Sequence, residues 1–116
     1  MRDVGFQVTR HCLTLLLPDD LGGAYLEEIR EEILEAIALR RDVSAVVFDC
    51  TNLRLVDQQD MRCLVNLINC IKLMGKKVGL CSISAGMAAV LVSLNVDITG
   101  CIYGFNLDDA IGKLQV

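Results

Sequence analysis

Three aspartates follow segments that the sequence predicts to be strands, and carboxylates in such places can hold a metal ion. Asp19 and Asp20 come after one apolar run, and Asp49 ends a later one. A phosphoacceptor (receiver) domain uses a similar set, in which an acidic pair binds Mg²⁺ beside a phosphorylatable aspartate. The spacing disfavours this interpretation, because about thirty residues and one predicted helix separate Asp20 from Asp49. A receiver places a helix, a strand and a second helix there, so turn and cap roles are the simpler interpretation and the receiver stays the alternative.

The cysteines and the histidine give no metal-binding pattern. Zinc sites need ligands clustered at short spacing. Here no C-x-x-C pair occurs, and His11 is the single histidine. Each cysteine lies in an apolar run, where a free thiol behaves as a small hydrophobic group. We therefore predict no metal site, no cofactor and six reduced, non-catalytic thiols: Cys12, Cys50, Cys63, Cys70, Cys81 and Cys101.

Sequence motifs of the common catalytic and phosphate-binding sites are missing. The chain has no G-x-S-x-G, no G-x-x-x-x-G-K-[ST] and no G-x-G-x-x-G. The pair Gly22-Gly23 is too short for a phosphate loop, and a turn into a helix is its simpler role. These observations predict that the protein is not an enzyme.

Composition and charge exclude several other classes of protein. The 116 residues are 53% hydrophobic and 22% charged, which indicates one folded domain over 1–116 and excludes disorder. The net charge of -4 and the lack of long basic runs disfavour nucleic acid and anionic membranes as partners. Asp3 and Gln7 interrupt the apolar start, which disfavours a signal peptide. No apolar stretch approaches the roughly 20 residues of a membrane span. We expect a soluble, cytoplasmic protein.

The hydrophobic pattern predicts the order ββαβαβαβα. Alternating or continuous apolar runs predict the strands, and apolar residues at three- and four-residue steps predict the helices. The expected strands are Val4–Val8, Cys12–Leu17, Ser44–Cys50, Lys77–Ile83 and Cys101–Tyr103. The expected helices are Leu21–Arg40, Asp57–Gly75, a third that Ser84 or Ser82 caps and that ends near Leu94, and Leu107–Leu114, which Asn106 caps. This order predicts an α/β fold with a mixed four- to five-stranded sheet and helices mainly on one face.

One segment of this pattern leads from a buried strand through a short loop to a helix start. Asp57 is a good N-cap, and Asp60 three residues later makes a pair similar to a capping box. Gln58 and Gln59 stand just inside the helix. A helix start has free N–H groups and a positive dipole end, which suit an anion or a phosphorylated side chain.

The segment resembles the STAS domain, the module of anti-sigma factor antagonists and stressosome scaffold proteins. Asp49, Thr51, Val56 and Asp57 match its pattern, in which a strand ends in Asp, a hydroxyl residue follows in the loop, and an apolar-Asp pair begins the second helix. The stretches Lys72–Val78 and Val90–Leu94 look similar too, so the resemblance covers nearly the whole chain and is closest to the short, single-domain stressosome subunit.

The resemblance implies a bacterial regulatory module of signal transduction in the stress response. Such a module sequesters a switch kinase or an anti-sigma partner, or builds a scaffold with other STAS chains, as an oligomer or a large complex. The partner-binding residues that it implies are Asp49, Thr51, Asp57, Gln58 and Gln59. A lipid- or nucleotide-binding role is a further alternative that the resemblance allows.

The chain departs from the family at the position of the regulatory serine or threonine, which here is Gln58. Phosphorylation adds about -1.5 to -2 charges and usually works as the switch at this helix start. Glutamine has no hydroxyl group and cannot form a phosphoester. We therefore expect no phosphorylation at the usual position.

Overall fold

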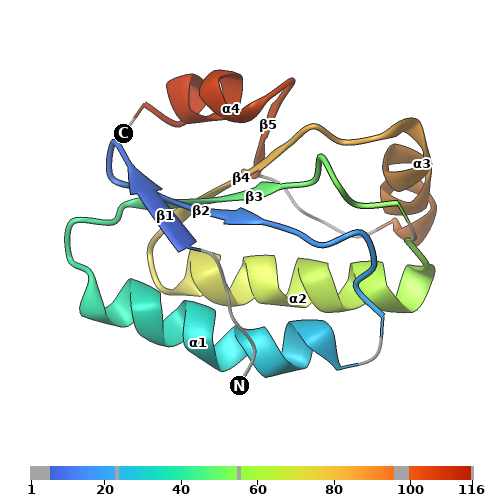
Figure 1. Cartoon of the computed structure of the whole chain (residues 1–116), viewed down its shortest axis with the longest axis horizontal. Helices are drawn as coiled ribbons and strands as arrows, with labels where there is room; N and C mark the ends of the chain where they lie inside the picture. Colours follow the sequence, from blue (N-terminus) through green and yellow to red (C-terminus); the bar gives the residue numbers. More distant parts are fainter. Residues whose placement is uncertain (1–5, 23, 55, 96–99, 116) are drawn as a thin grey trace.

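The structure, a computed structural model, describes residues 6–22, 24–54, 56–95 and 100–115. Its centre is a five-stranded sheet in the order β1-β2-β3-β4-β5 (Figure 1). The strands are β1 (Phe6–Thr9), β2 (Cys12–Leu16), β3 (Ala45–Asp49), β4 (Lys77–Cys81) and β5 (Ile102–Gly104). β1 pairs antiparallel with β2, and the other neighbours pair in parallel. The predicted mixed sheet is therefore confirmed. Val4 and Gly5 of the predicted first strand, and Gly23, lie outside the described residues.

In the described residues, four helices pack on the two faces of this sheet. They are α1 (Tyr25–Leu39), α2 (Gln58–Leu73), α3 (Ala85–Leu94) and α4 (Leu107–Leu114). Figure 1 shows α1 and α2 side by side under the sheet, with α4 on the opposite face. Met87 and Leu94 of α3 belong to the same buried core as α1 and α2. The prediction that the helices lie mainly on one face is thus confirmed.

Side chains alternate between the two faces of the sheet along each strand, and this divides the core into a larger and a smaller part. Leu13 and Leu15 of β2 pack with α1 and α2 in the larger part, together with Phe48 of β3. Cys12 faces the other way, into a smaller core with Ala110 of α4. Successive side chains of a strand point to opposite faces, so one strand supplies both cores. The larger core contains most of the buried apolar residues, and among the described helices α4 is the one that covers the opposite face.

Several elements differ from their predicted bounds, and for two of them the structure shows a local reason. The first helix begins at Tyr25 and not at Leu21, because the Asp20 carboxylate accepts a hydrogen bond from the Gly22 N–H at 2.8 Å and holds a turn there. β4 ends at Cys81 and not at Ile83, because Ser82 adopts a left-handed conformation with φ of 58°. Ser84 is the residue that caps α3, accepting from the Met87 N–H at 3.1 Å.

The parallel strands bring several loops together at their carboxyl ends. Asp49 at the end of β3 lies in register with Leu16 of β2 and Cys81 of β4. The Arg54 N–H donates to the Asp19 carbonyl at 2.8 Å, which ties the loop after β3 to the loop after β2. The candidate residues therefore gather at one edge of the sheet. In the described part of the chain, no helix is long and apolar enough to cross a membrane.

Candidate functional site

The start of α2 is an exposed, side-chain-capped helix end. Asp57 has the extended backbone of an N-cap, and its carboxylate accepts from the Asp60 N–H at 2.7 Å. This confirms the cap that the sequence predicts. Gln58 and Gln59 follow, and both are exposed. Their amides can each donate and accept hydrogen bonds, so this surface suits contact with another molecule.

Acidic side chains gather beside this helix start. Asp57 and Asp60 line a cavity of about 370 Å³ together with Asp20, which comes from the loop after β2. Burial raises the pKa of the Asp60 carboxyl, and the negative charges of Asp57 and Asp20 raise it further. The tertiary fold thus adds a third carboxylate to the two that the local sequence places at the α2 start.

Asp49 and Thr51 form a separate turn after β3. The Asp49 carboxylate accepts from the Thr51 N–H at 3.0 Å and from its hydroxyl at 2.6 Å. Asp49 lines a different cavity, of about 410 Å³, whose other lining residues are Gln7, Thr14, Leu16 and Leu107. This cavity lies beside the edge of α4, on the face opposite α1 and α2.

The five predicted site residues therefore fall into two groups. Asp57, Gln58 and Gln59 lie together at the α2 start, whereas Asp49 and Thr51 form a hydrogen-bonded turn of their own. All of them lie at the carboxyl-end edge of the sheet, but the carboxylates of Asp49 and Asp57 line different cavities. A partner that touches both groups must span this edge.

The acids of the receiver alternative do not form one ligand group. Asp20 lines the cavity with Asp57 and Asp60, and Asp49 lines the other one. Within the described ranges, no three or more His, Cys, Asp or Glu side chains are placed to hold a metal ion. The antiparallel pairing of β1 with β2 also differs from the all-parallel sheet of receivers. The geometry gives this alternative no support.

The buried thiols are held in their protonated form. All six cysteines are free. Burial raises the pKa of Cys12, Cys81 and Cys101 to about 11 and that of Cys50 to about 12. A thiol reacts as its thiolate, so these four groups are poor nucleophiles at neutral pH. The Cys50 N–H donates to the Cys81 carbonyl at 3.0 Å, but the two thiols belong to the cores on opposite faces of the sheet.

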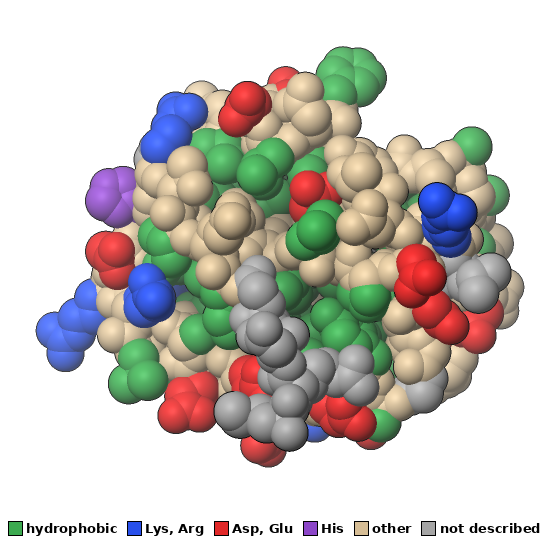
Figure 2. Space-filling view, in the orientation of Figure 1, with side chains coloured by type: hydrophobic (Ala, Val, Ile, Leu, Met, Phe, Trp, Pro, Cys, Tyr) green, Lys and Arg blue, Asp and Glu red, His purple; other side chains and the backbone are tan. Residues whose placement is uncertain are grey.

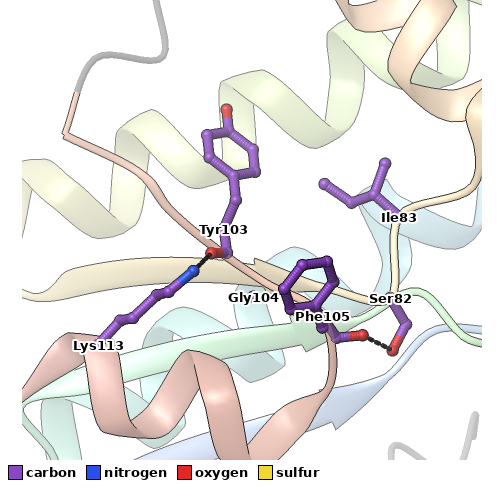
Figure 3. A pocket seen from close by; sticks show the side chains of 6 residues that line it. All are labelled: Ser82, Ile83, Tyr103, Gly104, Phe105 and Lys113. Atoms are coloured by element: carbon purple, nitrogen blue, oxygen red, sulfur yellow. Dashed lines mark hydrogen bonds between the residues drawn. The ribbon is translucent and has the colours of Figure 1, made fainter.

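Sequence reasoning missed a third cavity, of about 260 Å³, at the ends of β4 and β5 (Figure 3). The Ser82 hydroxyl donates to the Phe105 carbonyl at 3.3 Å, and the Lys113 ammonium donates to the Tyr103 carbonyl at 2.9 Å. The Phe105 side chain is 89% exposed, and the Lys113 nitrogen lies 5.9 Å from the centre of its ring. An aromatic residue in the polar turn before α4 was the available sequence signal.

Comparisons with known proteins agree with this architecture. A family model for the STAS domain matches residues 4–103. A serine-to-glutamate variant of RsbS from Moorella thermoacetica is 22% identical, with a TM-score of 0.84 over 98% of this chain and 96% of that one. A chain of the stressosome, described as a signal integration and transduction hub, is 22% identical, with a TM-score of 0.83 and 96% of each chain covered. The unphosphorylated anti-sigma factor antagonist SpoIIAA is 18% identical, with a TM-score of 0.71 over 97% and 98%. Curated protein sequences give no significant match.

Proposed function

The chain belongs to the STAS domain family, and from this premise we propose that it is a non-catalytic regulatory module that works by binding other proteins. Its type is that of the anti-sigma factor antagonists and stressosome scaffold proteins. One observation carries the proposal: the α2 start is capped by Asp57 and presents Gln58 and Gln59 to solvent beside three carboxylates. This surface has hydrogen-bonding groups and negative charge, which suit contact with another protein.

The chemistry of the α2 start suits recognition of a protein surface. The Asp57 carboxylate accepts the hydrogen bond of the Asp60 N–H. The N–H groups of Gln58 and Gln59 have no acceptor within their own helix. A partner can supply carbonyl or carboxylate oxygens to them. The exposed amide side chains add donors and acceptors of both kinds. Asp49 and Thr51 extend the proposed contact toward the edge of α4.

Gln58 fixes the state of this site. A phosphate group at this position would place about -1.5 to -2 charges beside Asp57 and Asp60. Glutamine keeps the position neutral and cannot be phosphorylated, so the further repulsion that a phosphate would add to these carboxylates never develops. In this proposal the chain stays in the partner-competent state that corresponds to the unphosphorylated form of a switchable relative.

The proposed partner is a switch kinase, an anti-sigma protein or another STAS chain, in a bacterial cytoplasmic pathway that responds to stress. A complex with such partners is the working form of a module without catalysis. The family membership and the structural likeness to RsbS and SpoIIAA support this type of function.

A pull-down from native cytosol tests the proposal. Three baits are compared: the unaltered chain, Gln58→Glu, and Gln115→Glu, which adds the same charge at an exposed glutamine at the end of α4. We expect a protein partner with the unaltered chain and with Gln115→Glu, and its loss with Gln58→Glu. Mass measurement of the complex then gives its stoichiometry. A partner that all three baits recover equally would show that the α2 start is not the binding surface.

A further inference from the structure

The sheet has two edge strands, β1 and β5, and the two edges differ in how they are protected (Figure 1). An edge strand presents backbone N–H and C=O groups to which another chain can bind, and proteins usually cover or shorten such edges. β5 is three residues long, and β1 is four residues long. The less protected of the two edges is a candidate binding surface, separate from the α2 start.

The edge of β5 is blocked by a lysine. The Ser82 N–H donates to the Gly104 carbonyl at 3.2 Å, so the backbone of Gly104 faces β4. Backbone groups of successive strand residues face opposite sides, so the Tyr103 carbonyl faces the open edge. There it accepts a hydrogen bond from the Lys113 ammonium at 2.9 Å, as Figure 3 shows. A lysine on a very short edge strand is a common protection against the addition of another strand.

The edge of β1 has backbone groups that face outward. Arg10 and His11, with φ of 53° and 66°, form the two-residue turn between β1 and β2. Two positive φ values are typical of a type I′ hairpin, in which Thr9 before the turn is hydrogen-bonded to the residue after it. Hydrogen-bonded and non-hydrogen-bonded pairs then alternate along the ladder. The backbone groups of Phe6 and Val8 therefore face away from β2, and β1 contains no proline and no charged side chain.

The side chains of β1 determine which kind of segment fits beside it. Phe6 and Val8 are half-buried and pack against the larger core, on the face that α1 covers. Gln7 and Thr9 are exposed on the other face, where Gln7 lines the cavity of about 410 Å³. Side chains directly opposite each other on neighbouring strands are in contact. Apolar side chains opposite Phe6 and Val8, with small polar side chains between them, therefore complement both faces.

Positive charge lies at the hairpin end of this edge. The hairpin turn and the loop from α1 to β3 carry three arginines and one acid: Arg10, Arg40, Arg41 and Asp42. The Ser44 N–H donates to the His11 carbonyl at 2.9 Å, which holds the loop against the turn. In Figure 2 the histidine of the turn, coloured purple, lies between Lys or Arg side chains. An acidic residue at the matching end of an added segment complements this charge.

We propose that the β1 edge binds an extended segment of a partner protein, which adds to the sheet as a further strand antiparallel to β1. The N–H and C=O groups of Phe6 and Val8 pair with the backbone of the segment, so the ligand is a peptide in strand conformation. Its side chains alternate between apolar and small polar, and an acid lies near Arg10. Antiparallel pairing is slightly more stable per residue than parallel pairing. The edge includes no residue of the α2 start, so this inference does not depend on the proposed function.

Synthetic peptides test the proposal on the purified chain. The probe is the acetylated, amidated peptide Asp-Thr-Val-Thr-Val-Thr, whose valines lie opposite Val8 and Phe6 and whose aspartate lies near Arg10. A second peptide carries N-methyl groups on both valines, which removes the N–H groups that face β1. The matched control carries one N-methyl group on the threonine between the valines, where the N–H faces solvent. Calorimetry gives the affinity of each peptide, and NMR hydrogen exchange gives the protection of single amides.

Proline substitutions test the same contact from the side of the chain. Val8→Pro removes an N–H that faces outward, where an edge strand tolerates proline. Val8→Ala is its control, because it shortens the side chain and keeps the N–H. Gln7→Pro removes an N–H that faces Thr14 of β2, so it should lower the melting temperature more than Val8→Pro does. The reverse order would mean that other backbone groups face the edge and would overturn the proposal.

We expect the probe and the control peptide to bind the unaltered chain equally well. The peptide with N-methyl valines should bind about tenfold or more weakly, because it covers the Val8 and Phe6 carbonyls without donating to them. Val8→Pro should weaken probe binding by about tenfold relative to Val8→Ala, for the same reason. The bound probe should slow the exchange of the Phe6 and Val8 amides and leave Tyr103 unchanged.

Three results would overturn the proposal. The first is no binding of the probe, and the second is equal binding of the probe and the peptide with N-methyl valines. The third is protection of the Phe6 and Val8 amides in the free chain that rises with its concentration, because a second copy would then occupy the edge.

Discussion

The starts of α2 and α4 are built from the same parts and differ in electrostatics. Each has an Asx side chain at the N-cap that accepts from the N–H three residues later, and an acid at that later position. At α4 the cap is the neutral Asn106, and Asp109 accepts from the Phe105 N–H at 2.8 Å. The hydrogen bond from Phe105 lowers the pKa of the Asp109 carboxyl, and Lys113 at 3.3 Å lowers it further.

At α2 the same positions hold two acids, and a third is close. Asp57 caps the helix, Asp60 follows in its first turn, and Asp20 lines the same cavity. Burial and the two neighbouring carboxylates raise the pKa of Asp60. No basic side chain compensates these acids in the described ranges.

This difference distinguishes a structural helix start from a functional one. At the start of α4 the Asp109 carboxylate accepts from the Phe105 N–H and pairs with Lys113, as at a purely structural helix end. The start of α2 keeps a repulsion among carboxylates that a neutral cap would remove. Local choices that reduce stability are expected at functional sites, where perturbed pKa values also cluster. The contrast supports the α2 start, and not the α4 start, as the binding surface.

The largest expected effect comes from breaking the attachment of α4 to the sheet. A Cβ atom at Gly104 of β5 would lie 2.5 Å from the Ala110 nitrogen of α4. Gly104→Ala should therefore cost about 3 kcal/mol of the free energy of unfolding, because backbone atoms must shift. Gly112→Ala is the control within α4, where a Cβ meets nothing within 4 Å, and it should stabilise by about 0.5 kcal/mol. Urea unfolding measures the free energy of unfolding of both variants. A Gly104→Ala variant as stable as the unaltered chain would show that β5 and α4 are not in close contact.

The next largest effect is expected from removing the N-caps of α2 and α4, which compares the two helix starts directly. Asn106→Ala should cost about 1 kcal/mol, the usual value of a lost N-cap. Asp57→Ala should cost less, because losing the cap also removes the repulsion between Asp57 and Asp60. Thermal melting at neutral pH measures the two variants side by side. A larger loss for Asp57→Ala would contradict the electrostatic contrast between the two helix starts.

The smallest expected effect is that the contributions of Asp60 and Asp109 to stability depend on pH in opposite directions. The pKa of Asp109 is lowered, so its contribution to stability is present above its unfolded value and is lost as the pH falls through the folded value. The pKa of Asp60 is raised, so its contribution is present below the unfolded value and is lost as the pH rises through the folded one.

Stability measured from about pH 3 to pH 6, the range around the ordinary aspartate pKa, separates these two contributions. Asp109→Asn should make the loss of stability on acidification shallower. Asp60→Asn should make it steeper, because a compensating gain at low pH is removed. Slopes that change in the same direction for both variants would contradict the assigned directions.

The sequence predicts the features of this fold that are local. Caps at Asp57 and Asn106 depend on residues three positions apart, and the strands depend on short apolar runs, so both follow from the sequence. The approach of Asp20 to Asp60 depends on how the loop after β2 packs, which no local pattern specifies. The left-handed Ser82 that ends β4 is of the same kind, because its N–H donates to the Gly104 carbonyl of a strand twenty residues later.

The division of the predicted site into two groups has a similar cause. Asp49 and Asp57 are eight positions apart, and a strand end and a loop lie between them. Which face of the sheet the Asp49 side chain takes is set by the parity of β3 against the core, where Phe48 points toward α1 and α2. The resemblance implies one set of partner-binding residues that includes both acids, and the tertiary structure assigns the two to different cavities.

Calorimetric binding of the recovered partner to Gln58→Glu tests the central claim most directly, that the α2 start is a protein-binding surface. The substitution places one more negative charge beside Asp57 and Asp60, so affinity should fall about 100-fold, which is about 2.7 kcal/mol. The melting temperature should stay unchanged, because an acid in the first turn suits the helix dipole. Gln58→Ser and Gln115→Glu should bind as the unaltered chain does. Unchanged affinity of Gln58→Glu, with the same melting temperature, would contradict the account and place the interface elsewhere on the molecule.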